Sequence, residues 1–281
     1  MLRIFLSPTR SGSGAFLRCF ENNPEVDQVY HQPIKSGYRQ DGVFDYSWFD
    51  LLNDPRTLVA KETIGGFEDP ETKFSPLPGR EGLPTVGAWY ASPDLITTLE
   101  PIVLLRDPVQ TWASIERLNQ YSAGRSRYHS PYDFFLNSYR AVAEFALEAR
   151  RADLPVWCVT QEMLALDIYT MLKRICDKWK LPWHRSMVDW TLPYGEHTWF
   201  SEEAIRRMRD DPRFQKSKES LAAAHRWDYR PSSTGFLDPN VVGEIEAELR
   251  CLYNDVQLLA TADFGWDEGL AGEVGGSPRR E

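Results

Sequence analysis

The chain has 281 residues, a formal net charge of −9 at pH 7 and a hydrophobic content of 42%. Such a length and composition suit one globular α/β domain with insertions. The acidic balance argues against nucleic acid, polysaccharide sulfates or an acidic membrane surface as the main partner. No apolar run reaches the ~20 residues of a membrane span, and too few apolar residues precede Ser7 for a signal peptide. We therefore expect a cytoplasmic protein without a membrane partner.

The cysteines indicate neither disulfides nor a metal site. Cys19, Cys158, Cys176 and Cys251 lie far apart, and the sequence has no CxxC pair or His/Cys cluster. Free thiols are the expectation, and no metal is expected.

The amino-terminal segment predicts an anion-binding loop. An apolar run from Leu2 to Leu6 indicates a strand, SPTRSGSGA (residues 7–15) follows it, and a helix begins near Phe16. This order can direct backbone N–H groups and a helix N-terminus at one phosphate. The loop is not a Walker loop, because it has no Gly-Lys pair. The alternative is a turn that only caps the helix, with Ser13 as the N-cap.

A second segment predicts another anion site at the same edge of the sheet. The apolar run PIVLL (residues 101–105) indicates a buried strand, and RDPVQTWAS (residues 106–114) follows it. Asp107 can cap the helix that Pro108 begins. Arg106 then lies at the carboxyl end of the strand and Ser114 two turns into the helix, which suits a second phosphate. The alternative is a local ion pair between Arg106 and Asp107.

Together the two segments resemble the nucleotide-binding pair of the PAPS-dependent sulfotransferases, of the bacterial small-molecule type. That family has a Pro-Lys/Arg-Ser-Gly-Thr/Ser-Thr loop and an Arg-Asn/Asp-Pro-x5-Ser segment, whose spacing Arg106 and Ser114 keep. A third segment, WCVTQEMLALD (residues 157–167), resembles the family's strand that ends in Tyr-Glu-Asp-Leu. Two departures are Thr9, one residue more than usual, and Gly14, where many members have a hydroxyl.

The resemblance implies a fold and a reaction. The fold is the P-loop NTPase-like sulfotransferase fold: α/β, three-layered, with a central, mainly parallel sheet of about four to five strands flanked by helices. The reaction is transfer of a sulfuryl group from PAPS to an O–H or N–H of an acceptor, with release of PAP and no metal requirement.

The resemblance also implies the residues of the nucleotide site. Arg10 would stabilise the bridging oxygen, while Arg106 and Ser114 would hold the 3′-phosphate. The segment 224–230, with Arg226, could fold over the nucleotide, or it could be a solvated turn before the last helix. The 5′-phosphate would be held by the loop residues Ser11, Gly12, Ser13, Gly14 and Ala15.

The general base is ambiguous in the sequence. Many family members read His-Glu-Pro where this chain has His31, Gln32 and Pro33, and an amide cannot accept the proton usefully. His31 and Glu62, at the end of another expected strand, are the candidates, and His129 trails both.

The rest of the chain predicts a single domain, 1–269, with inserted loops near 65–93 and 120–131 and a flexible tail, 270–281. Further strands are expected at 26–30, 57–61, 95–106 and 154–160, and helices at 132–151, 168–180, 202–208 and 241–259, with polar residues up to 225. We expect a monomer or homodimer acting on a neutral or cationic small molecule. A small-molecule kinase with an atypical P-loop and a non-catalytic PAP-binding protein are the alternatives.

Overall fold

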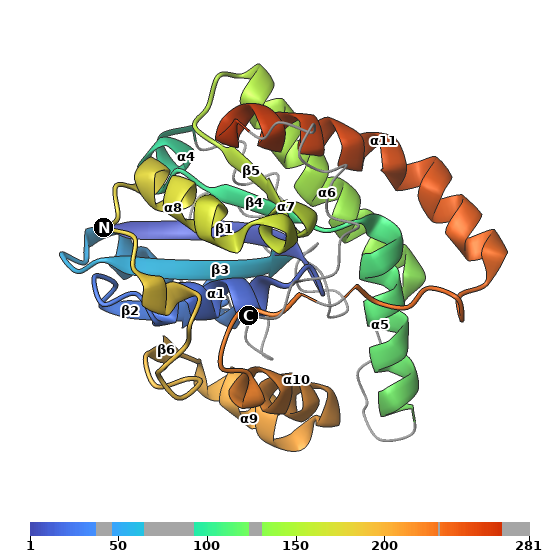
Figure 1. Ribbon diagram of the computed structural model, residues 1–281, viewed down its shortest axis with the longest axis horizontal. Helices are drawn as coiled ribbons and strands as arrows, with labels where there is room; N and C mark the ends of the chain where they lie inside the picture. The colour runs from blue at the N-terminus through green and yellow to red at the C-terminus, as the bar shows by residue number, and fades with distance from the viewer. Residues whose placement is uncertain (38–46, 65–92, 124–130, 230, 266–281) are drawn as a thin grey trace, which may run out of the picture.

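The structure is a computed structural model that describes residues 1–37, 47–64, 93–123, 131–229 and 231–265 (Figure 1). Most of the expected insert at 65–93, the segment 124–130 with His129, and the expected tail at 270–281 lie outside these ranges. The loop expected from residue 120 begins only after Ser122, because the preceding helix continues that far.

One parallel sheet forms the centre of the fold. Among the described residues it has six strands in the order β5-β4-β1-β3-β2-β6. The sequence predicted about four to five strands; β6 has only two residues, too few to show a strand pattern. The strands are β1 (Leu2–Pro8), β2 (Gln28–His31), β3 (Leu58–Ile64), β4 (Ile102–Leu105), β5 (Trp157–Thr160) and β6 (Thr198–Trp199).

The strand order places a ligand site after β1. The chain leaves β1 towards β2 and β3 on one side and then returns to β4 on the other side. The connections therefore diverge at the carboxyl end of β1, and ligands of open parallel sheets bind at such a switch point. The loop after β1 lies there, between the ends of β3 and β4.

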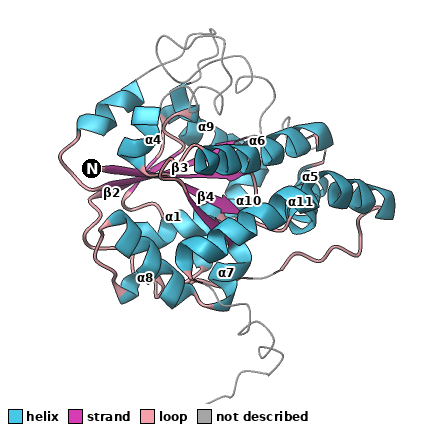
Figure 2. Cartoon of the chain, turned by 90° about the horizontal axis from the view of Figure 1, so that it is seen from above, coloured by secondary structure: helices cyan, strands magenta, loops and turns pink. Residues whose placement is uncertain are grey.

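Helices cover both faces of the sheet, which gives the predicted three layers. In Figure 2, α4 and α6 lie on one face and α1, α7 and α8 on the other. No described helix is both long and apolar enough to cross a membrane. The helices are α1 (Ser13–Glu21), α4 (Pro93–Leu99), α5 (Pro108–Ser122), α6 (Tyr132–Arg151), α7 (Gln161–Leu166), α8 (Ile168–Trp179), α9 (Glu202–Asp210), α10 (Pro212–Ala223) and α11 (Pro239–Phe264), with 3₁₀ turns at Lys35–Gly37, Ser47–Asn53 and Arg185–Met187.

Two of the expected elements are wrong. Residues 95–99 form the end of α4 rather than a strand, and the polar stretch after residue 208 contains α10. The start signals of α10 are present, since Asp211 caps it and Pro212 begins it. Its apolar periodicity is missing because no residue of α10 is fully buried.

An aromatic ladder joins β1, α1 and α8 in the core. Phe5 contacts Phe16 at a ring-centroid distance of 4.8 Å, Phe16 contacts Phe20 at 5.3 Å, and Phe20 contacts Trp179 at 5.2 Å. All four side chains are less than 2% exposed. The ladder fixes α1, and therefore the loop that precedes it, against the sheet.

We expect Phe16→Ala to lower the free energy of unfolding by about 3–5 kcal/mol, because it leaves a cavity between two rings. Leu258→Ala is the control, since Leu258 of α11 is 64% exposed. Urea denaturation of Phe16→Ala, Leu258→Ala and the parent protein measures the loss in the free energy of unfolding. Equal small losses in the two variants would contradict the packing described here.

Candidate nucleotide-binding site

The loop between β1 and α1 has the backbone of a tight anion loop. Arg10 (φ 66°) and Gly12 (φ 82°) are both in the left-handed region. Gly12 is the N-cap of α1, and its carbonyl accepts from Phe16 N at 3.1 Å. The alternative role for Ser13 as the N-cap is therefore wrong, because the left-handed turn at Gly12 makes Ser13 the first helical residue.

Gln161, which the sequence analysis did not single out, packs across the loop. It is the first residue of α7, directly after β5, and is 5% exposed. A Cβ on Gly12 would lie 2.5 Å from Gln161 Oε1, and its φ of 82° is one that other residues rarely adopt, so glycine is strongly favoured at this position. The signal for Gln161 was its place immediately after the strand of the third segment.

Arg10 joins the two predicted phosphate segments. Its Nε donates to Ser114 Oγ of α5 at 3.1 Å, and its Nη1 donates to Ser217 Oγ of α10 at 3.2 Å. Burial, and then the charges of Arg106 and Arg213, lower the pKa of Arg10 to about 10. The guanidinium is thus surrounded by hydroxyls and other cations, a setting that favours an incoming anion. The sequence analysis missed Ser217.

Arg106 lies where the sequence predicted it, at the carboxyl end of β4. It is 7% exposed, and its Nη2 donates to Gln110 Oε1 at 3.4 Å and to Ser232 Oγ at 3.2 Å. The ring of Tyr229 lies 5.5 Å from the guanidinium. Tyr229 and Ser232 therefore reach the rim of the predicted 3′-phosphate site.

Asp107 caps α5, as predicted, by accepting from Gln110 N at 2.9 Å. Its ion pair is with Arg250 of α11 at 2.8 Å. The alternative of a local Arg106–Asp107 pair is therefore not what the structure has. Arg226 is exposed and faces Asp189 across an isolated antiparallel bridge.

Several buried polar atoms at this edge have no hydrogen-bond partner among the described residues. Buried polar groups are nearly always paired, so a cluster of unpaired ones indicates a ligand. These atoms are Ser7 Oγ, Ser11 Oγ, His31 Nδ1, Arg106 Nε and Gln161 Oε1.

Lys61 is a further buried cation beside the loop, and the sequence analysis read it only as the end of a strand. It lies in register with Phe5 of β1 and His31 of β2. Its Nζ donates to Ser13 Oγ and Thr63 Oγ1, both at 3.4 Å. Burial, opposed by Glu62 and reinforced by Lys35 and Arg10, lowers the pKa of Lys61 to about 7.

His31 and Glu62, the two candidate bases, lie in different surroundings. Burial and the charge of Lys61 hold the pKa of His31 well below its ordinary value, so its imidazole is neutral at pH 7. Glu62 follows Lys61 on the strand and so points to the opposite face of the sheet. Its Oε1 accepts from Ile34 N at 2.6 Å and Lys35 N at 3.3 Å, which fixes the 3₁₀ turn after β2.

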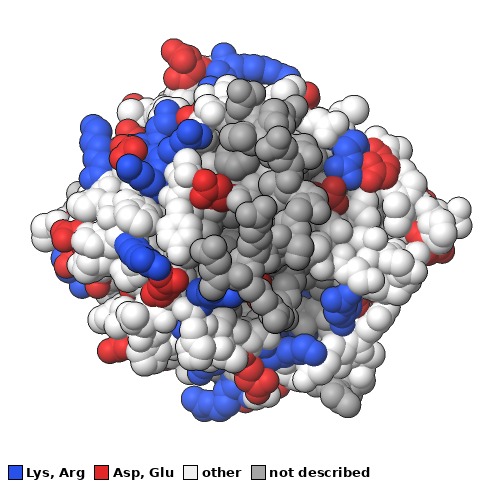
Figure 3. Space-filling model, viewed as in Figure 1, with Lys and Arg blue, Asp and Glu red and all other residues white. Residues whose placement is uncertain are grey.

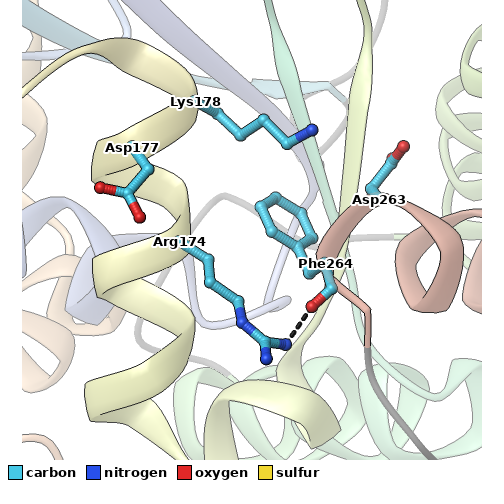
Figure 4. A pocket seen from close by; sticks show the side chains of 5 residues that line it. All are labelled: Arg174, Asp177, Lys178, Asp263 and Phe264. Atoms are coloured by element: carbon cyan, nitrogen blue, oxygen red, sulfur yellow. Dashed lines mark hydrogen bonds between the residues drawn. The ribbon is translucent and has the colours of Figure 1, made fainter.

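A separate depression of about 280 Å³ lies away from this edge (Figure 4). Arg174, Asp177 and Lys178 of α8 line it with Asp263 and Phe264 of α11, and Arg174 donates to the Phe264 carbonyl. Asp263 Oδ2 accepts from Cys158 N near the start of β5, so this depression lies near the amino ends of the strands, opposite to the candidate site.

Figure 3 shows acidic and basic side chains intermixed over the described surface of that view.

The arrangement is that of an α/β fold with a central parallel sheet, and one solved structure agrees at the level of fold. The structure of mouse sulfotransferase SULT7A1 complexed with PAP matches with a TM-score of 0.52 and 13% identity, over 92% of this chain and 89% of that chain. The sulfotransferase domain from the curacin biosynthetic pathway matches with a TM-score of 0.47 and 14% identity, over 88% and 97% of the two chains. The domain from the Synechococcus PCC 7002 olefin synthase gives 0.44 and 16%, over 88% and 94%.

No protein-family model and no curated protein sequence matches the chain. The first of the structural matches shows that the chain has the sulfotransferase fold, which confirms the fold class predicted from the sequence.

The lowered pKa of Lys61 predicts a pH-dependent stability. Between pH 7 and the ordinary lysine value, the unfolded chain binds the proton that folded Lys61 does not, so stability rises with pH in that range. We expect Lys61→Met to be more stable than the parent protein at pH 7. The difference in the free energy of unfolding between Lys61→Met and the parent protein should shrink by up to about 1.4 kcal/mol for each pH unit above pH 7.

Urea denaturation between pH 7 and 9.5 measures this difference. The control is Lys173→Met, which removes an exposed charge from α8. A constant difference between Lys61→Met and the parent protein across this range would contradict the assignment.

Proposed function

We propose that the protein is a PAPS-dependent sulfotransferase that transfers a sulfuryl group to a hydroxyl or amine of a small molecule and releases PAP. The main support is the cluster of unpaired buried polar atoms beside Arg10, Lys61 and Arg106. Fixed cations and hydroxyl donors in a buried place suit a phosphate-bearing anion such as a nucleotide. The PAP complex of the structural neighbour SULT7A1 is consistent with this choice of nucleotide.

The two predicted segments would hold the two ends of the nucleotide. The backbone of the loop and its neighbour Ala15 would hold the 5′-phosphate, together with the buried hydroxyl of Ser11. Arg106 would hold the 3′-phosphate together with Ser114, which lies about two turns into α5. Arg226 is kept as a candidate of this site only through its neighbour Tyr229, which contacts Arg106.

Sulfuryl transfer needs charge neutralisation more than covalent help from the protein. The bond from sulfur to the bridging oxygen breaks as the acceptor oxygen or nitrogen attacks sulfur, and negative charge develops on the departing phosphate. Arg10 and Lys61 lie at the loop end where that charge forms. An adjacent anion favours the charged form of Lys61, so binding itself would prepare this cation.

We propose His31 rather than Glu62 as the base that takes the acceptor proton. His31 is neutral, and it lies in register with Lys61 on the α1 side of the sheet. The Phe200 ring, 5.1 Å from the His31 ring, would form an aromatic wall beside the acceptor. With the acidic balance of the chain, this supports a neutral or cationic small molecule.

The proposal is tested with purified protein, PAPS and a panel of phenols, alcohols and amines, read by mass spectrometry for the gain of one SO₃ group. Calorimetry with PAP and with ATP·Mg²⁺ runs beside it. Binding of PAP with sulfation of a panel member supports the proposal. Preference for ATP·Mg²⁺ would indicate the kinase alternative, and PAP binding without sulfation of any acceptor would indicate a non-catalytic binding protein.

We expect Arg106→Ala to weaken PAP binding by about 1.5–3 kcal/mol, the range for a charged hydrogen bond. Isothermal titration calorimetry measures the change. Arg151→Ala, at the exposed end of α6, is the matched control for loss of one positive charge. Unchanged affinity in Arg106→Ala would remove Arg106 from the nucleotide site.

His31→Ala should lower kcat about 100-fold or more, because proton transfer loses its base, while PAP affinity stays nearly unchanged. Glu62→Gln should instead lower stability by about 1 kcal/mol, since a neutral amide oxygen replaces the charged acceptor of Ile34 N and Lys35 N. Rate measurements on the sulfated panel compound and thermal melts separate the two effects. A large rate loss in a well-folded Glu62→Gln variant, with little in His31→Ala, would reverse the assignment.

A further inference from the structure

One face of α10 lies against the phosphate loop. Its residues Arg213, Ser217 and Leu221 are spaced by four and therefore share one side of the helix. Ser217 Oγ accepts from Arg10 Nη1 at 3.2 Å. A Cβ on Gly14 would lie 3.2 Å from Leu221 Cδ1, so the same side also touches the start of α1.

Arg213 belongs to the charged surroundings of Arg10. It is half-buried, four residues before Ser217 on the same side of α10. Its charge is close enough to lower the pKa of Arg10, as does the charge of Arg106. Burial lowers the pKa of Arg213 itself, opposed by Asp211. Like charges brought together at a partly buried place repel, and an anion between them removes that cost.

The other cations of α10 are directed elsewhere. Lys216 lies over the ring of Tyr121 on α5, with Nζ 3.9 Å from the ring centroid. Lys218 is exposed. Of the described residues of α10, Ser217 and Leu221 therefore touch the loop and the start of α1, and Arg213 lies on the same side of the helix.

We propose that Arg213 and Ser217 of α10 bind the 5′ end of the nucleotide, together with Arg10. The inference rests on the proposed function and adds a third element, after the loop and α5, to the binding site. A phosphate monoester carries about −1.5 to −2 charges at pH 7. A 3′,5′-bisphosphorylated nucleotide therefore brings several negative charges, which Arg10, Lys61 and Arg106 share with Arg213.

Calorimetry with PAP on the full chain tests the inference in four variants: Arg213→Gln, Arg213→Lys, Ser217→Ala and Lys218→Gln. We expect the Kd for PAP to rise about tenfold or more in Arg213→Gln and about two- to tenfold in Ser217→Ala. Lys218→Gln removes the same charge from the same helix and should stay within about twofold. Arg213→Lys should recover part of the loss, because it keeps the charge.

The two adenosine monophosphates identify the end that α10 binds. The loss in Arg213→Gln should persist with adenosine 5′-monophosphate and disappear with adenosine 3′-monophosphate. A loss confined to the 3′-monophosphate would overturn the assignment to the 5′ end. Thermal melts of each variant show whether it is folded, and an unfolded Arg213→Gln would leave Arg213→Lys and Ser217→Ala to decide.

The failure of this inference is distinguishable from failure of the proposed function. If the parent protein binds PAP and Arg106→Ala weakens it, but Arg213→Gln behaves like Lys218→Gln, the inference about α10 is wrong and the proposed function stands. If the parent protein does not bind PAP, the proposed function is wrong and α10 has no such role.

Discussion

The hydrogen bonds of the half-buried Arg10 guanidinium are the interactions on which the site depends. The guanidinium joins three elements far apart in the sequence, because its hydrogen bonds reach Ser114 of α5 and Ser217 of α10 from the loop after β1. Both partners are neutral hydroxyls. The neighbouring charges of Arg106 and Arg213 are positive and lower the pKa of Arg10. Such a cation is unfavourable without an anion, so the core must stabilise a site that is incomplete by itself. The aromatic ladder from Phe5 to Trp179 is part of that core.

A network of hydrogen bonds holds the β4 side of the site. The Arg106 carbonyl accepts from Tyr139 OH at 2.7 Å, and Asp107 N donates to Glu162 Oε1 at 3.1 Å. Tyr253 OH donates to Glu162 Oε2 at 2.9 Å, and Arg250 pairs with Asp107. Burial raises the pKa of Glu162, and these hydrogen bonds oppose that shift. Residues of α6, α7 and α11 thus fix the backbone at Arg106, while the loop reaches its geometry through strained left-handed residues such as Arg10.

Local signals predicted what depends on neighbouring residues in the chain. The Asp107 cap, the strand before Arg106 and the glycine of the tight loop all follow from local chemistry. Lys61 could not be found in this way, because its role depends on which strands are neighbours and in which register. Gln161 had a local signal in its place directly after β5, but its contact with Gly12 depends on the tertiary fold. The choice between Lys61 and Glu62 could not be predicted for the same reason. Adjacent residues of a strand face opposite sides of the sheet, and only the strand register shows that Lys61, not Glu62, faces the loop.

The position of α10 accounts for a departure of the loop from the family pattern. Gly14 stands where many sulfotransferases have a hydroxyl, and a side chain there would meet Leu221 of α10 at 3.2 Å from its Cβ. That distance is tighter than ordinary van der Waals contact, so a side chain at position 14 would require Leu221 to shift by a few tenths of an ångström. One turn earlier, α10 brings the hydroxyl of Ser217 to Arg10. The small residue at position 14 and the close approach of α10 are therefore two aspects of one arrangement, in which Ser217 of the helix lies beside the loop.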